Sequence, residues 1–208
     1  MNAEINEDLK NYIEQNILPK YNAFDKGHSI DHVQKVIADS LDLAEKFDVD
    51  VDMVYTIAAY HDIGIEISRQ LHHIISGETL LADENLKKWF TPQQIETMQQ
   101  AVEDHRASND YEPRSIYGKI VAEADRDISL KTILRRTLQF GLKKYPDADF
   151  DFHFDRAYSH IVNKYGENGY LKLYLHSPKN EQGLVEVRAA LRDKETLKKM
   201  FEEIFESL

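Results

Sequence analysis

The sequence predicts an all-α protein, and three observations support this fold class. The 208 residues contain only eight glycines and five prolines, so long stretches lack the residues that most often interrupt helices. Apolar residues within these stretches recur every three or four positions, which is the spacing of an amphipathic helix. The segment "TPQQIE" also has the composition of a helix start, because Thr91 can cap, Pro92 suits the first helical position and Gln94 can complete a capping box.

Five helices are predicted in the N-terminal half of the chain. The first stops near Pro19, because proline interrupts a helix. The second presents an apolar face that includes Val33 and Val36, and the third ends at the glycine of "DIG". The predicted ranges are about 4–17, 29–47, 51–62, 67–84 and 92–105.

Three further helices are predicted after a loop at residues 106–114, over about 115–143, 152–165 and 180–206. In the glycine-punctuated segment 166–183, alternate leucines at 171, 173 and 175 would suit a short strand, so this segment stays open. The last helix carries an apolar stripe that could dock on its own domain or on a second copy in a homodimer. Without an internal repeat or clear linker, we expect a single helical domain over residues 1–208.

Composition and charge exclude several classes of protein. A net charge of -11 speaks against a protein that binds a nucleic acid polymer through a broad basic face. The absence of cysteine excludes disulfides and thiolate ligands, so any metal must be held by nitrogen and oxygen. The N-terminus is acidic and amphipathic, and no run of eighteen apolar residues occurs. We therefore expect a cytoplasmic protein without a membrane segment.

The histidines and one pair of adjacent polar residues point to a site. Six of the nine histidines fall between residues 28 and 105. His28 and His32 are four residues apart and share a helix face, and His32 continues the apolar stripe towards Val36. His61 and Asp62 directly follow the apolar run "MVYTIAA". Burying an imidazole beside a carboxylate is unfavourable by several kcal/mol unless each finds a partner, and a metal ion is one such partner.

A fourth candidate ligand is Asp125, which lies among alanines in "AEADRD". Small neighbours let its helix approach others and leave room for an ion. The set His32, His61, Asp62 and Asp125 would suit manganese, iron, zinc, nickel or magnesium. Each histidine taken alone is more often a satisfied core residue, and an aspartate in "ADRD" is more often paired with an arginine such as Arg126. Their order and context favour the joint metal site.

The segments "HSIDHVQKV", "AAYHDIG" and "VAEADRD" resemble the HD superfamily of metal-dependent phosphohydrolases, which is named for its His-Asp doublet. The resemblance covers about residues 25–130. It implies an all-helical HD-domain bundle followed by a C-terminal helical extension over about 145–208. It also implies that His32, His61, Asp62 and Asp125 hold a metal ion.

Some members of this superfamily bind a second metal through two more histidines. His72 or His73 and then His105 match these positions. Small residues, Ser76 and Gly77, follow His72 and His73 by four positions, so either histidine could face the site. Some members have two adjacent histidines at the later position, whereas His105 is followed by Arg106. The glutamate-aspartate pair that follows the doublet in alarmone hydrolases is also missing, because only Glu66 is present. These departures point away from the cyclic dinucleotide phosphodiesterases and the alarmone hydrolases. The overall length and the helical tail instead resemble the small stand-alone HD hydrolases, several of which act on nucleotides.

The resemblance implies that a water activated by one or two divalent metal ions hydrolyses a phosphate ester or anhydride. The substrate would be a nucleotide or another small phosphorylated metabolite. The proton of the attacking water would be accepted by Asp62 or by a metal-free histidine of the set His72, His73 and His105. Arg69 is the first candidate to balance the phosphate charge, ahead of Arg106 and Arg126.

Two other functions fit much of the same sequence. Two irons on the full set of histidines and aspartates would give an HD-type oxygenase. A non-catalytic HD module could instead sense a nucleotide or present its helical tail to a partner. Five aromatic residues could stack a base but are more often core in helices: Tyr111, Tyr117, Phe152, Phe154 and Tyr158. We expect His153, His160 and His176 to lie outside the site.

Overall fold

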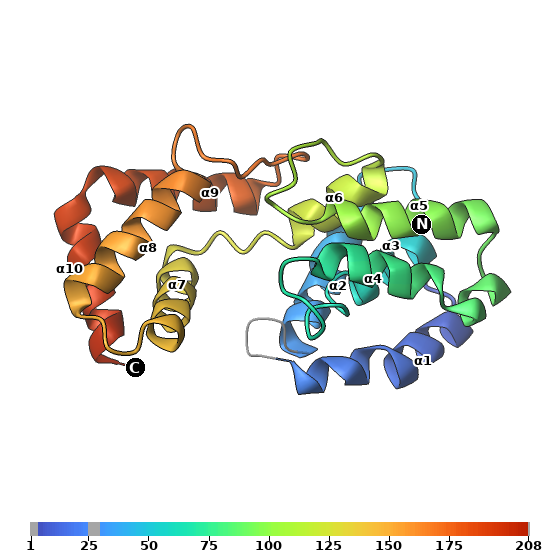
Figure 1. Ribbon diagram of the computed structural model, residues 1–208. Helices are drawn as coiled ribbons and strands as arrows, with labels where there is room; N and C mark the ends of the chain where they lie inside the picture. Colours follow the sequence, from blue (N-terminus) through green and yellow to red (C-terminus); the bar gives the residue numbers. More distant parts are fainter. Residues whose placement is uncertain (1–3, 25–29, 208) are drawn as a thin grey trace. The chain divides into compact units, whose positions relative to one another are not determined.

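The computed structural model describes residues 4–24 and 30–207, and all regular secondary structure in these ranges is helical (Figure 1). The all-α fold class is therefore confirmed. Contacts divide the chain into two compact units, residues 1–125 and 126–208. The expected single domain over residues 1–208 stays a prediction. His28 lies outside the described residues, so its predicted place beside His32 does too.

The first unit is built around one helix that is buried along almost its whole length. This helix is α3 (Val51–Tyr60), whose residues from Met53 to Tyr60 are all buried. Helix α2 packs on both α3 and α6, while α5 packs on α3, α4 and α6. The other elements are α1 (Glu7–Asn16), η1 (Leu18–Ala23), α2 (Ile30–Ala44), α4 (His72–Leu81), η2 (Glu84–Lys88), α5 (Pro92–Asp104) and α6 (Ile116–Ala124).

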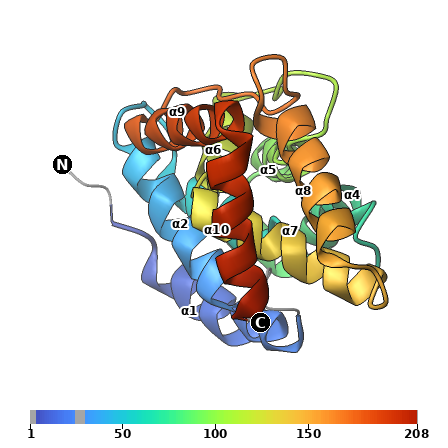
Figure 2. The same cartoon turned by 90° about the vertical axis from the view of Figure 1, so that its left-hand side faces the viewer.

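The second unit has four helices and its own aromatic core. They are α7 (Leu130–Lys144), α8 (Phe150–Tyr165), α9 (Pro178–Arg192) and α10 (Lys194–Glu206). Helix α10 lies against α7, α8 and α9 (Figure 2). The Phe154 and Phe201 rings meet edge to face with centroids 5.6 Å apart, and both side chains are buried. Such ring pairs add to the stabilisation that comes from burying their area.

The prediction of two long helices was wrong, because each of these stretches forms two separate helices in the structure. The stretch 115–143 is interrupted at residues 125–129, where the Ser129 hydroxyl accepts the N–H of Thr132 and caps α7. The stretch 180–206 is interrupted at Asp193, whose carboxylate accepts the N–H of Thr196, 3.1 Å away, and caps α10. In both cases a polar side chain satisfies a free N–H at a helix start.

Two smaller expectations also differ from the structure. The helix predicted from residue 67 begins only at His72, because residues 61–67 form successive turns. No strand forms among residues 171–175, where Leu171 is buried by packing without a paired strand. The capping box of Thr91 and Gln94 at the start of α5 is confirmed.

Candidate metal centre

Three side chains from different helices form a first cluster. His32 comes from α2, His61 ends α3, and Asp125 directly follows α6. His32 Nε2 lies 3.2 Å from Asp125 Oδ1 and 3.4 Å from His61 Nε2, and His61 Nε2 lies 3.9 Å from Asp125 Oδ1. Helices α3 and α6 pack on each other, and both carry fully or nearly buried alanines close to their C-terminal ends: Ala58, Ala59, Ala122 and Ala124.

A second cluster lies where α4 begins and α5 ends. The Nε2 atoms of His72 and His105 are 3.2 Å apart. They lie 3.3 and 3.4 Å from the same atom, Oδ1 of Asp62. The structure therefore turns His72 towards Asp62 and His105.

Asp62 links the two clusters through its two oxygens. Its Oδ2 lies 3.3 Å from His61 Nε2 and 3.7 Å from His32 Nε2, while its Oδ1 faces His72 and His105. The structure thus brings together four imidazoles and two carboxylates. Two groups within this set have the geometry to hold an ion, namely His32, His61 and Asp62, and Asp62, His72 and His105.

Three of the four histidines share one main-chain interaction. Their Nδ1 atoms approach the carbonyl oxygen three residues earlier, at 2.8 Å for His61, 2.9 Å for His72 and 2.5 Å for His105. A carbonyl can only accept a hydrogen bond, so we assign the proton to Nδ1 in each ring. In the neutral ring this tautomer leaves the Nε2 lone pair free, and Nε2 is the atom that faces the clusters. Metal-binding histidines are commonly oriented in this way.

Close approaches of the backbone bring the second cluster together. A Cβ on Gly64 would lie 2.7 Å from the carbonyl oxygen of His72, so only glycine lets this turn touch the start of α4. A Cβ on Gly77 would lie 2.9 Å from Glu103 Cγ and 3.1 Å from the Gln99 carbonyl oxygen, where α4 crosses α5. The N–H of Gly64 also donates to the Ser76 hydroxyl, 2.9 Å away.

The electrostatics of the first cluster favour charged aspartates and a protonated histidine. Burial lowers the pKa of His61, but the Asp62 carboxylate outweighs it and raises this pKa to about 9. Burial opposes ionisation of Asp62, but the charge of His61 and hydrogen bonds from His105 and His61 hold its pKa well below the usual range. The pKa of Asp125 is likewise lowered, because the hydrogen bond and charge of His32 outweigh burial. A bound cation would take the place of the proton on His61.

The second cluster is less basic. Burial and the nearby charge of His105 lower the pKa of His72 to about 4, against the attraction of Asp62. Its ring is therefore neutral near pH 7. Neutral imidazole is the form that binds a metal.

Two predicted candidates lie beside the clusters rather than in them. His73 is buried, but its Nδ1 lies 3.5 Å from the Arg106 guanidinium, which also donates to the Gln70 carbonyl. Burial and Arg106 lower the pKa of His73 to about 4. Arg69 is exposed, and its carbonyl is the oxygen that accepts from His72. The predicted charge-balancing role of Arg69 is not tested by these contacts and stays a prediction.

The histidines expected to lie outside the site all belong to the second unit. His153 is buried in α8, His160 lies on the same helix, and His176 pairs with Glu181, 3.0 Å away. Arg126, an alternative partner for Asp125, is also assigned to that unit. Its role as a cation of the site stays a prediction.

No pattern in the sequence points to Tyr21, which holds the doublet in place. Its buried hydroxyl donates to the Ala59 carbonyl at 2.9 Å and accepts the N–H of Asp62 at 3.3 Å. Both partners are backbone atoms about forty residues away, so no side-chain pattern could have pointed to this contact.

The donor set fits a divalent metal. All its members supply nitrogen or oxygen, three Nε2 atoms are oriented by main-chain carbonyls, and a charged carboxylate stands between the clusters. Such ligands suit iron, manganese, zinc, nickel or magnesium.

Fold and site together define an all-helical protein with a His/Asp site suited to divalent metal. Residues 29–128 match the model of the HD domain family, so the chain contains an HD domain, a family that generally contains metal-dependent phosphohydrolases. No curated protein and no solved structure shows significant similarity to the chain. Among the described residues, no helix is long and apolar enough to cross a membrane.

Proposed function

We propose that this chain is a metal-dependent phosphohydrolase that cleaves a phosphate ester or anhydride of a small phosphorylated compound. The observation that carries this proposal is the position of Asp62. One of its oxygens faces His61 and the other faces His72 and His105, so Asp62 would help to hold a cation at either cluster. Sites that hold two neighbouring cations are a recurring device for in-line displacement at phosphorus.

When bound, a divalent cation polarises a phosphoryl oxygen of the substrate and lowers the pKa of the water that it coordinates. The chain's own residues would orient and charge this site. The carbonyls that bind Nδ1 of His61, His72 and His105 fix the rings, and Tyr21 holds the backbone of Asp62. The negative charge of Asp62 would stabilise a bound cation, and that cation would attract the phosphate group of the substrate.

An anionic substrate needs cations beside the metal. Arg106 lies beside the second cluster, where its guanidinium is within 3.5 Å of His73 Nδ1 and its charge lowers the pKa of His72. Arg69 is exposed three residues before His72. We propose that one or both contact the substrate phosphate, with nucleotides among the candidate substrates. The physiological metal, manganese included, is part of this proposal and needs measurement.

The same residues also favour a second candidate function. Four histidines and two carboxylates, with one carboxylate between the clusters, form a set that would equally hold two irons. An HD-type oxygenase would contain iron when purified and would consume dioxygen. The phosphohydrolase would release phosphate or a phosphorylated product without dioxygen.

Metal analysis of protein purified without added ions, followed by a phosphoester screen with the metal found, tests the proposal. We expect phosphate release that His61→Ala and Asp62→Ala abolish together with metal retention, while the helical circular dichroism spectrum persists. His176→Ala is the matched control, because this exposed imidazole pairs with Glu181 in the second unit. Unchanged metal content in both His61→Ala and Asp62→Ala would contradict the proposed metal site. Metal retention and ligand binding without turnover would favour a non-catalytic sensing module.

A further inference from the structure

The two units differ strongly in charge. Residues 126–208 carry 15 Lys and Arg against 13 Asp and Glu, whereas residues 1–125 carry 11 against 24. The acidic character of the chain is therefore confined to the first unit. Two copies of the chain attract each other most strongly when the second unit of one meets the first unit of the other.

The second unit exposes aromatic rings and cations together where α7 ends and α8 begins. Phe140, Tyr145 and Phe152 are 45, 37 and 45% exposed. The Tyr145 and Phe152 rings meet edge to face with centroids 5.2 Å apart. Lys144 lies 5.3 Å from the Tyr145 centroid, and Arg156 lies 5.5 Å from that of Phe140. We call these five residues the aromatic patch.

The aromatic patch is unlike an ordinary solvated surface. Among the described residues, neither Lys144 nor Arg156 forms an ion pair, although both lie in an acidic protein. Burial lowers the pKa of Arg156, and its Nε is buried without a hydrogen-bond partner. Aromatic residues and arginine, grouped together and exposed, are the composition of protein interfaces.

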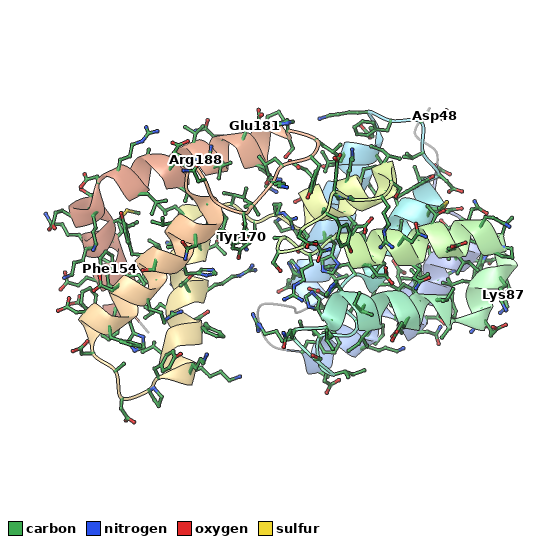
Figure 3. All side chains as sticks on the ribbon, turned by 45° about the horizontal axis from the view of Figure 1, so that its top comes forward. Asp48, Lys87, Phe154, Tyr170, Glu181 and Arg188 are labelled. Atoms are coloured by element: carbon green, nitrogen blue, oxygen red, sulfur yellow. The ribbon has the colours of Figure 1, made fainter. Side chains whose placement is uncertain are left out.

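The first unit has a concave surface of the opposite charge. A groove of about 780 Å³ lies between the start of α1, the end of α2 and the connection to α3. Its lining includes Leu41 and Phe47, which are apolar, and the carboxylates of Glu4, Glu7, Asp42 and Asp48. Asp48, labelled in Figure 3, lies on the α2–α3 connection. We call this surface the acidic groove.

The acidic groove has little charge compensation from its own lining. Lys10 is the single lysine or arginine among the described residues that line it. None of Glu4, Glu7, Asp42 and Asp48 forms an ion pair within the described part of the chain. Exposed carboxylates in this number repel one another, so a cation brought between them would be stabilised.

We propose that the aromatic patch of one copy docks in the acidic groove of a second copy. Its rings would cover Leu41 and Phe47, while Lys144 and Arg156 would meet the carboxylates of the groove. Such an interface is head-to-tail, because each copy contributes a different surface. No residue of the metal centre belongs to either surface.

Head-to-tail docking predicts an unusual mixing result. Two double variants test this result, and both change only exposed side chains. The patch variant is Lys144→Glu/Phe152→Ser, and the groove variant is Asp42→Lys/Asp48→Lys. By sedimentation velocity at low salt, wild type should associate with increasing concentration, and each variant should associate about tenfold more weakly or worse. An equimolar mixture should form a one-to-one dimer and nothing larger, since one intact groove and one intact patch remain.

Charge controls accompany these variants. Lys172→Glu and Asp110→Lys make similar changes at exposed positions outside both surfaces and should associate as wild type does. Raising the salt concentration should weaken the wild-type association. Monomeric wild type at every concentration would overturn the proposal, and so would a mixture that remains monomeric. Binding of a single-stranded oligonucleotide by the patch in place of self-association would also overturn it.

Discussion

Oδ1 of Asp62 lies 3.3 Å from Nε2 of His72, whereas the neighbouring His73 turns its ring to Arg106. This relationship distinguishes two adjacent histidines that the sequence left equivalent. We predict that His72→Ala removes the ligand of one ion and lowers the metal content by about one equivalent, if two ions bind. His73→Ala should retain the full content, because its Nδ1 faces a cation. Elemental analysis of both purified variants checks this.

The pair His72→Ala and His73→Ala is a matched control, since both remove one imidazole from the first turn of α4. Equal metal loss in the two variants would show that the second cluster does not depend on the orientation seen here. Loss of metal only in His73→Ala would contradict the assignment outright.

The close approach of Gly64 to α4 leads to a second prediction. A methyl group at Gly64 would meet the backbone of His72, while one at Gly77 would meet a flexible glutamate side chain first. Backbone yields less readily than a side chain end. We expect Gly64→Ala to destabilise the fold by about 1–3 kcal/mol and Gly77→Ala by less. Urea unfolding measures both, and metal content should fall more in Gly64→Ala because His72 is displaced.

If Gly77→Ala proved the more destabilising, the packing of α4 on α5 would matter more than the turn after the doublet. If neither substitution changed stability or metal content, the close approaches would have no role in building the second cluster.

Much of the fold followed from periodicity and capping, whereas its interruptions did not. The Thr91 capping box marked the start of α5 because three residues with a known joint role stand together. Ser129 and Asp193 cap helices singly, within stretches whose apolar spacing continues on both sides. A lone serine or aspartate is common inside helices too, so periodicity favoured unbroken helices at both places.

The candidate site was predictable where a residue type carries its own chemistry. The doublet His61 and Asp62 drew attention because a buried charge needs a partner. Choosing between His72 and His73 required the exact rotation of α4, which adjacent small residues at 76 and 77 could not supply. The role of Tyr21 rests on backbone atoms brought close by the fold.

Tyr21 leads to a third prediction about the doublet. Tyr21→Phe removes a hydroxyl that pairs with the Ala59 carbonyl and the Asp62 N–H inside the core. Leaving these buried groups unpaired should destabilise the fold by about 1–3 kcal/mol and loosen Asp62. The free energy of unfolding in urea measures the first effect, and the midpoint of metal removal by a chelator measures the second.

Tyr158→Phe is the control for Tyr21→Phe. The Tyr158 hydroxyl also donates to a carbonyl, that of Leu191 at 3.3 Å, but its side chain is only half-buried and lies in the second unit. It should cause a smaller loss of stability and leave the chelator midpoint unchanged. A loss of stability in Tyr21→Phe without a change in metal retention would limit Tyr21 to a structural role.

Asp83 leads to a prediction about pH. Its Oδ2 accepts hydrogen bonds from Tyr12 at 2.5 Å and Tyr60 at 2.6 Å. Burial raises the pKa of Asp83, but the two tyrosine hydroxyls outweigh it and lower this pKa below the usual value. Because the folded pKa is the lower one, the carboxylate contributes stability that is complete above the unfolded pKa of about 3.9. This contribution is lost as the pH falls through the folded pKa.

Asp83→Asn isolates this effect, because asparagine can still accept the N–H of Asn85 that Asp83 caps. We expect the variant to melt at a lower temperature than wild type at neutral pH, since a neutral amide accepts the tyrosine hydroxyls more weakly than a carboxylate does. The difference should begin to shrink as the pH falls below about 3.9, and it should approach zero once the pH is below the lower, folded pKa, where Asp83 is neutral in folded wild type. Thermal melts of both proteins across this range measure it. A difference that stays constant with pH would show that the charge of Asp83 does not stabilise the fold.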